Sequence, residues 1–417
     1  MHIERHTLDN GLKVVLHPDR TLPLAALNIT YHVGSKNERP GKTGLAHLFE
    51  HMLFEGSQHV GDRKHFQYLQ QVGGVANGAT SRDRTYYYET VPSRHLELML
   101  WLESDRMGFL LPELTAEKLE TQRQVVMNER LQRVDNQPYG RASERLFELL
   151  FGPDHPYRWP VIGAMEDIAG AGLDDLKSFF STYYHPGNAV LTLAGDFETE
   201  TALAAVERYF GPLPSGPPIP PRPQGDGGLA RTADERMTDH VQLPRVFLGY
   251  RAPAFGSRDW YGTDLLSTAL SDGKSSPLYR QLVYRRQLAQ SAAAYVYDYE
   301  LPGALLVVAT ARNGVTADEL ETALDEELAA ALDVLNEDDL GRAKNRLQVA
   351  IASHFQALDD RADVLSQLTT YFDRPELALE MERRYEGFTA SELSALGRRL
   401  LDRQARVRIT VVPGEAA

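Results

Sequence analysis

Gly44-Leu-Ala-His47-Leu-Phe-Glu50-His51-Met-Leu-Phe54 contains two histidines four positions apart, with a glutamate between them. Because an α-helix repeats every 3.6 residues, His47 and His51 would lie on one helix face, where they could hold one metal ion. Glu50 would project beside that ion and take a proton from a water that the ion activates. The segment therefore predicts a helix that carries a catalytic zinc site.

Chance is the simpler explanation of two histidines and a glutamate at this spacing. The neighbouring residues argue against chance, because most of them are apolar: Leu45, Ala46, Leu48, Phe49, Met52, Leu53 and Phe54. Burying three ionisable side chains in such a helix costs free energy unless something pairs with them, and a metal ion would do so. A catalytic zinc has three protein ligands and one open position, so a third ligand must come from another segment.

The residues alone do not decide that third ligand. Residues 115–133 are expected to form a helix, and Glu129 falls on its apolar side, four positions after Val125. On a helix this rich in charge, a solvated glutamate is the simpler interpretation. Both interpretations stay open on the local pattern.

Composition narrows the chemistry further. The chain has 417 residues, no cysteine and a formal net charge of -14 at pH 7. Any metal must therefore bind His, Asp or Glu, and nucleic acid is not expected as the main partner. No apolar run approaches the roughly 20 residues of a membrane-spanning helix. The lack of cysteine and of a signal-peptide pattern favours a cytoplasmic protein, or a periplasmic one if a leader was removed.

A Pro/Gly-rich segment at residues 211–228, GPLPSGPPIPPRPQGDGG, divides the chain into halves of similar size. Such a composition predicts an extended linker without regular structure. We expect one domain over 1–210, which carries the metal motif, and a second over 229–417. Both halves alternate strand patterns, such as 25–33 and 245–250, with long helical patterns, which suggests duplicated α/β units.

Several stretches resemble one known family. GLAHLFEHMLFEGS, at residues 44–57, resembles the signature of the inverzincin zinc metallopeptidases, the pitrilysin and mitochondrial processing peptidase family, or peptidase family M16. LDNGLKVVL, GGVANGATSRDRTYYYETVP, HPYRWPVIG and YYHPGNAVLTLAGDF also match, and DGKSSPLYRQLVYRRQLA matches more loosely. The resemblance implies an α+β fold of the LuxS/MPP-like metallohydrolase type. Its two homologous α/β domains would each be a mainly antiparallel sheet flanked by helices.

The resemblance also assigns the metal site. It implies one zinc ion per chain on His47, His51 and Glu129, with Glu50 as the general base of a zinc endopeptidase. The substrates would be peptides or unstructured segments, enclosed in a chamber formed with a second chain. Two other functions remain as alternatives: a non-catalytic structural subunit of the same fold, and a metalloenzyme acting on small molecules.

The same resemblance points to residues around the zinc. Asn77, Gly78 and Ala79 match an edge strand whose backbone pairs with an extended peptide, although Asn-Gly by itself is typical of a turn. Relatives usually have Ala at the position of Gly78. Many also carry a second glutamate where this chain has Gln122, and Glu120 is the nearest acid. Both Gln122 and Glu120 are therefore candidates for a place behind the ligands.

One departure from the family pattern concerns the partner. Relatives use an Arg and a Tyr seven residues apart, in the zinc-free domain, to grip the substrate and polarise its carbonyl. The matching positions in this chain are Val283 and Gln290. We therefore expect a heterodimer with a zinc-free sister subunit that supplies the pair, with a homodimer as the alternative. Arg280, Arg285, Arg286 or Tyr295 could do the same work from a shifted position.

Overall fold

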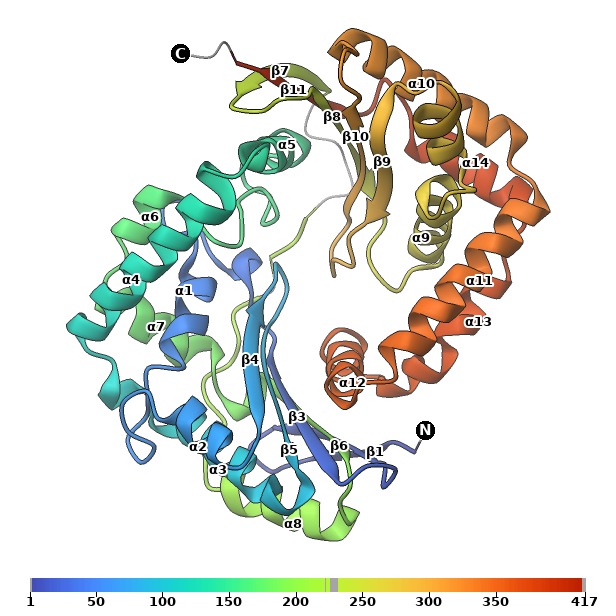
Figure 1. Cartoon of the computed structure of the whole chain (residues 1–417). Helices are drawn as coiled ribbons and strands as arrows, with labels where there is room; N and C mark the ends of the chain where they lie inside the picture. Colours follow the sequence, from blue (N-terminus) through green and yellow to red (C-terminus); the bar gives the residue numbers. More distant parts are fainter. Residues whose placement is uncertain (1, 222, 226–231, 415–417) are drawn as a thin grey trace. The chain divides into compact units, whose positions relative to one another are not determined.

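The computed structural model describes residues 2–221, 223–225 and 232–414 (Figure 1). The chain forms two compact units, each assembled from three segments. Unit 1 consists of Met1–Glu129, Pro160–Pro223 and Ala352–Glu380, and unit 2 of Arg130–Trp159, Gln224–Ile351 and Met381–Ala417. Each unit therefore contains a segment from the opposite side of the predicted linker. The described part of that linker, 211–221 and 223–225, contains no helix or strand, and its residues 222 and 226–228 lie outside the described residues.

Unit 1 is built on a six-stranded sheet of order β1-β2-β6-β3-β5-β4 (Figure 1). The strands are β1 Glu4–Thr7, β2 Lys13–Pro18, β6 Ala189–Gly195, β3 Leu24–Tyr31, β5 Thr85–Pro92 and β4 Val75–Thr80. β2 and β6 are parallel, and the other neighbours are antiparallel. β3 and β6 are buried along nearly their whole length, as expected of central strands. β4, by contrast, forms one edge of the sheet.

The helices of unit 1 come from both ends of the chain. They are α1 Leu45–Met52, α2 His65–Gln71, α3 Leu96–Phe109, α4 Ala116–Arg130, α6 Met165–Ala169, α7 Leu173–Tyr183, α8 Thr199–Phe210 and α12 Leu358–Phe372. α4 crosses the boundary of the unit with its last residue. The side of α1 that carries Phe49 packs into the core, with its ring 5.2 Å from Phe180 and 4.7 Å from Tyr184. The zinc motif therefore belongs to a helix whose apolar side is held by aromatic packing.

α12 is a helix of unit 1 from far along the chain, and the sequence patterns did not predict it. It packs on β3 and β6, where Leu358 and Ala362 contact Ala26 and Ala194. Asp363 forms a bidentate ion pair with the buried Arg84, which lies in the turn before β5. Nη2 of Arg84 is 2.8 Å from Oδ2 of Asp363. A helix far along the chain thus covers the sheet that the N-terminal residues form.

Unit 2 repeats the topology of unit 1. Its five-stranded sheet has the order β7-β11-β8-β10-β9. The strands are β7 Ala233–Asp239, β11 Val407–Pro413, β8 Arg245–Ala252, β10 Gly303–Ala311 and β9 Ala289–Val296. β7 and β11 are parallel and the other pairs antiparallel, as in β2-β6-β3-β5-β4. The duplication that the residues only suggest is therefore plain in the strand order, and the predicted fold class is confirmed.

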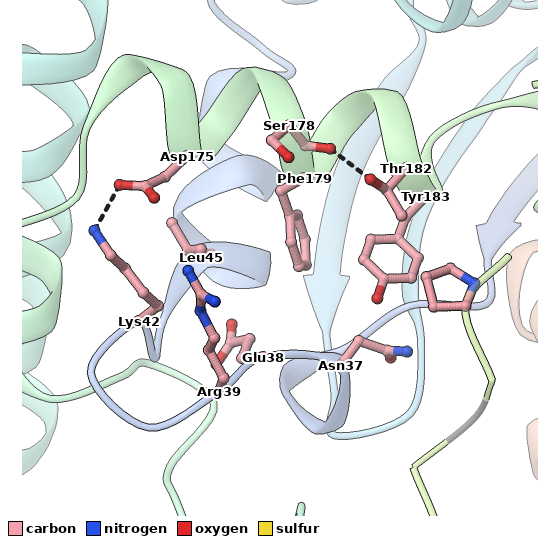
Figure 2. Close-up of a pocket in the computed structure, with 11 residues that line it drawn as sticks. Asn37, Glu38, Arg39, Lys42, Leu45, Asp175, Ser178, Phe179, Thr182 and Tyr183 are labelled. Atoms are coloured by element: carbon pink, nitrogen blue, oxygen red, sulfur yellow. Dashed lines mark hydrogen bonds and ion pairs between the residues drawn. The ribbon is translucent and has the colours of Figure 1, made fainter. Parts of the chain in front are cut away.

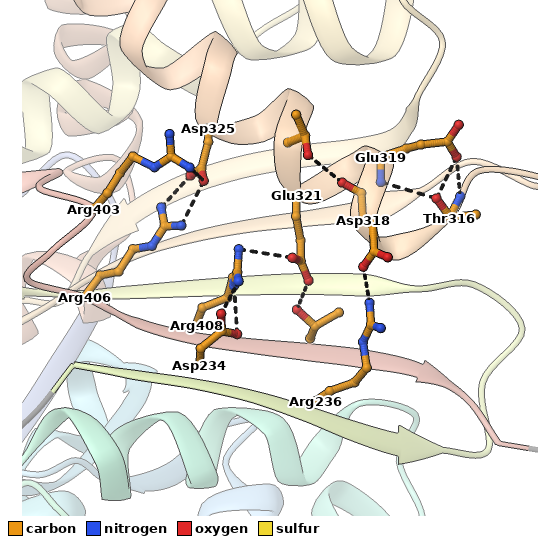
Figure 3. A network of polar contacts seen from close by, with 12 residues as sticks. Asp234, Arg236, Thr316, Asp318, Glu319, Glu321, Asp325, Arg403, Arg406 and Arg408 are labelled. Atoms are coloured by element: carbon orange, nitrogen blue, oxygen red, sulfur yellow. Dashed lines mark hydrogen bonds and ion pairs between the residues drawn. The ribbon is translucent and has the colours of Figure 1, made fainter.

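The helices of unit 2 are α5 Gly140–Leu150, α9 Arg258–Ser271, α10 Ala317–Val334, α13 Met381–Glu386, α14 Ala390–Leu400 and most of α11 Glu337–His354. α5 packs on β8 and β11, and a Cβ on Gly249 would lie 2.6 Å from Cδ2 of Leu146. Figure 3 shows how ion pairs hold α10 on the sheet: Asp325 pairs with Arg406, and Asp318 with Arg236. No helix among the described residues is long and apolar enough to cross a membrane.

Candidate metal centre

The start of α1 is held by a buried carboxylate. Both Oε atoms of Glu38 accept backbone N–H groups, from Gly44 at 2.9 Å and from Ala46 at 2.8 Å. Burial raises the pKa of Glu38 to about 8, although these two hydrogen bonds favour its charged form. Gly44 has φ 87°, and a Cβ there would lie 2.7 Å from the carbonyl oxygen of Ile162. Only glycine fits this turn without strain, so the helix begins at a defined point.

A cavity of about 340 Å³ opens beside this end of α1 (Figure 2). Its wall includes Glu38, Leu45 and the ion pair of Lys42 with Asp175, whose Nζ and Oδ2 are 2.7 Å apart. The lining contains neither histidine of the motif. The cavity is therefore separate from the candidate metal centre, which lies farther along the helix.

The structure brings His47, His51 and Glu129 together. Oε2 of Glu129 lies 3.3 Å from Nε2 of His51 and 3.8 Å from Nε2 of His47. The two imidazole rings, whose centroids are 4.9 Å apart, come from α1, and the carboxylate comes from α4. Ligand atoms roughly 2.0 to 2.1 Å from a tetrahedral zinc stand about 3.3 Å apart, so the observed spacings fit one ion.

The cluster is partly buried and remains accessible from solvent. The side chains of His47, Glu129 and His51 are 12%, 16% and 23% exposed. Burial lowers the pKa of His51, but its hydrogen bond to Glu129 and the negative charges of Glu50 and Glu129 outweigh burial and raise the pKa overall. Two imidazoles and two carboxylates thus share a space that strongly favours a cation.

Glu50 faces the edge strand of the sheet. Its Oε2 accepts a hydrogen bond from the hydroxyl of Thr80 at 2.6 Å. A Cβ on Gly78 would lie 3.3 Å from Cγ of Glu50. The predicted base therefore belongs to the helix of the two histidines and contacts strand β4.

Asn77, Gly78 and Ala79 form the middle of β4 rather than a turn. They pair with Tyr88, Tyr87 and Tyr86 of β5 on one side. β4 has a single strand neighbour within the described chain. Its other backbone edge is therefore the one that could pair with a further strand.

The two residues proposed to lie behind Glu129 differ in placement. Gln122 donates to Oε1 of Glu55 at 2.6 Å and also hydrogen-bonds His51. Glu120 points to an exposed side of α4, where it pairs with Arg123 and with Gln124 at 2.9 Å. The structure brings Gln122 to the cluster and does not bring Glu120 there.

Glu55 is a residue that the sequence analysis missed. It is buried just beyond α1, and its Oε2 accepts a hydrogen bond from Nε of Arg63 at 3.0 Å. Gln122 therefore links His51 to a second, buried carboxylate. Its spacing from His51 gave no helical signal, because α1 ends at Met52 and Glu55 lies beyond the helix.

The positions expected for the Arg/Tyr pair lie in unit 2. Val283 is half-buried and packs against the core of that unit, and Gln290 is exposed at the start of β9. Arg286 is engaged by Glu326 and Glu327, at 2.9 and 3.0 Å. α9, which precedes β9 as α1 precedes β4, contains no histidine.

A second group of ligand-type residues, His65, Glu89 and Glu103, is fully buried. Nε2 of His65 lies 2.6 Å from Oε1 of Glu89, and Nε of Arg106 donates to Glu103 at 2.7 Å. Burial raises the pKa of Glu89 to about 7 and of Glu103 to about 8, while it lowers that of His65 to about 3. Arg106 already supplies the positive charge, so the group ties α2, α3 and β5 together rather than forming an ion site.

Comparison with known proteins identifies the family of the chain. A family model described as "Insulinase (Peptidase family M16)" matches residues 13–153, and one described as "Peptidase M16 inactive domain" matches residues 171–347. The chain is 32% identical over 401 residues to "Zinc protease PqqE" of Helicobacter pylori, an alignment that covers 94% of this chain and 88% of the relative. The chain belongs to peptidase family M16, as its resemblance predicts.

Solved structures match along the whole chain. The crystal structure of a protease from Helicobacter pylori superposes with a TM-score of 0.90 at 28% identity and covers 99% of both chains. The structure of a "peptidase M16 inactive domain" from Pseudomonas fluorescens has a TM-score of 0.89 at 20% identity, over 100% of this chain and 99% of that one. The second similarity concerns the fold alone.

Proposed function

We propose that this chain is a zinc-dependent endopeptidase that cleaves peptides or unstructured segments. The observation that supports this most strongly is the convergence of His47, His51 and Glu129, with the charge of Glu50 close enough to act on His51. Relatives that match along nearly the whole chain are named zinc proteases. The spacing of the three ligand atoms fits one zinc ion and leaves a coordination position for water.

The roles of the residues follow from this arrangement. His47, His51 and Glu129 would hold the ion, which when bound supplies Lewis acidity toward water and the scissile carbonyl. Glu50 accepts a proton from the attacking water and delivers it to the leaving nitrogen. Gln122 and Glu55 orient His51 from behind.

Strand β4 is the proposed binding site of the substrate. An extended peptide would add to its outer edge, hydrogen-bonded to the backbone of Asn77, Gly78 and Ala79. Because Gly78 lies close to Glu50, this pairing would carry a peptide bond past the base. Along the sequence, residues 1–210 would be the zinc-binding half, 211–228 the linker and 229–417 the zinc-free half, while each compact unit includes a segment from the other half.

The function is tested by metal removal. The purified chain should contain one zinc per molecule and cleave a mixture of unstructured peptides, with products identified by mass spectrometry. Chelation should abolish cleavage and added Zn²⁺ should restore it, while circular dichroism stays unchanged. Bound zinc without cleavage of any peptide, with or without a partner chain, would instead support the structural-subunit alternative.

We further propose that the chain works beside a zinc-free sister subunit of the same fold. Val283 and Gln290 stand where donors to the substrate carbonyl are expected, and each such donor is typically worth about 10²- to 10³-fold in rate. The chain alone should therefore cleave peptides slowly. Co-expression with a sister chain that carries the Arg/Tyr pair should raise kcat by about 10²- to 10³-fold for each donor that the pair supplies.

Purification from the native cell, with identification of co-purifying chains, supplies the candidate sister. The homodimer is the competing assembly. Full activity of an isolated homodimer that is lost in Arg285→Ala or Tyr295→Phe would show that this chain has the donors at shifted positions. Lys274→Ala, another exposed cation of the same region, serves as the control for a general charge effect.

A further inference from the structure

We propose that Thr80 is a positioning residue that holds the carboxylate of Glu50 in place for proton transfer. Strand β4 would then have two roles: its backbone edge receives the peptide, and its last side chain orients the base. This role rests on the proposed function, because it matters only if Glu50 serves as the base.

Geometry places Thr80 and Gly78 on one face of β4. Side chains alternate along a strand, so residues two apart point the same way. Thr80 donates its hydroxyl to Oε2 of Glu50 at 2.6 Å, and the space above Gly78 borders Cγ of the same side chain. Glu50 is thus touched by one face of β4 at two successive positions.

Gly78 lies close to both Glu50 and Tyr87. A Cβ there would lie 2.9 Å from Cδ1 of Tyr87 and 3.3 Å from Cγ of Glu50, so one of the two neighbours would have to move. Tyr87 is fully buried, and Arg106 stacks on its ring at 4.0 Å. Since the ring is held, a larger residue at this position would be tight against both the ring and Glu50.

The backbone around Thr80 is held firmly. Thr80 pairs with Thr85 across the β4–β5 ladder, and the backbone N–H of Ser81 donates to the carbonyl of Arg84 at 2.8 Å. The hydroxyl of Ser81 accepts the N–H of Arg84 at 3.0 Å, and Arg84 is tied to Asp363 of α12. A tight turn anchored at its end therefore sets the position of the Thr80 hydroxyl.

The consequence is chemical. A glutamate side chain has three rotatable bonds, and fixing one carboxylate oxygen removes most of that freedom. With Oε2 accepting from Thr80, the carboxylate that would take the proton from water is held in one orientation. A hydrogen bond to a charged carboxylate is among the stronger ones, and misplacement of a reacting group by about 1 Å can cost roughly 10²-fold.

Thr80→Val tests this directly, since valine keeps the branched shape and loses only the hydroxyl. We expect kcat to fall by about 10- to 100-fold, with KM changed by less than about twofold, because the backbone edge of β4 is unchanged. Zinc content and zinc affinity, measured by chelator competition, should match the parent chain. Thr80→Ser should recover most of kcat, and Thr90→Val on the neighbouring strand should behave as the parent.

The outcomes distinguish failure of the proposed endopeptidase function from failure of the positioning role of Thr80. If the parent chain with zinc and its partner does not cleave peptides, the proposed function fails. If the parent cleaves and Thr80→Val has the same kcat, or loses kcat only together with zinc, the positioning role is wrong while the function stands. Should Thr80→Val fold poorly, the comparison of Thr80→Ser with Thr80→Ala decides by the same criterion.

Discussion

Glu50→Gln should reduce peptide cleavage by about 10²- to 10⁴-fold while one zinc ion per chain stays bound, because glutamine keeps the shape of the side chain and loses its basic oxygen. The amide can still accept the hydrogen bond from Thr80, so α1 and β4 should keep their contact. Zinc content and initial cleavage rates measured on one sample provide the test.

Glu120→Gln is the matched control for this change. It makes the same chemical substitution on an exposed residue of α4 that pairs with Arg123 and Gln124. Its cleavage rate should equal that of the parent chain. Near-normal cleavage by Glu50→Gln would remove Glu50 from its proposed role, and loss of zinc from that variant would mean that Glu50 supports the metal rather than the proton transfer.

Local patterns were sufficient for much of the fold and for the centre of the site. The i, i+4 spacing of His47 and His51 depends only on the helical repeat, and the structure indeed forms a helix over Leu45–Met52. The helix expected over residues 115–133 also forms, over Ala116–Arg130. Such periodicity shows which face of a segment is buried, whichever element of the fold covers that face.

The partner itself is not recorded in that pattern. Glu129 illustrates the limit, since its helix alone favours a solvated side chain and only the resemblance selected it; the structure places it beside both histidines. The exchange of segments between units is a second case. α12 lies on the sheet of unit 1, where Asp363 forms an ion pair with Arg84, 279 positions earlier in the chain. No local rule connects two such residues.

The contacts of Glu55 and Thr80 were not predicted for a related reason. Each is one polar residue in a segment whose local signals describe a turn or a strand, and each matters through a contact with another element: Gln122 of α4 and Glu50 of α1. Positions behind a site are chosen by what they touch. Sequence reasoning therefore finds the ligands more readily than the residues that orient them.

Glu129→Ala should lower the affinity for zinc sharply, and Glu120→Ala should leave it nearly unchanged. Removing Glu129 deletes the carboxylate that lies 3.3 and 3.8 Å from the two imidazoles, so it opens a second coordination position and removes a negative charge beside the ion. The loss should exceed the roughly 10- to 100-fold typical of a residue that only supports a ligand.

Titration of both metal-free variants with Zn²⁺ against a competing chelator measures this difference without reference to activity. Glu129 is half-buried and belongs to unit 1, so circular dichroism and thermal unfolding of the metal-free proteins show whether the alanine disturbs the fold. With folding intact, a large loss confined to Glu129→Ala assigns the third ligand to that residue. Retained affinity in Glu129→Ala with loss in Glu120→Ala would mean that α4 turns a different face toward the histidines and that the wrong glutamate was chosen.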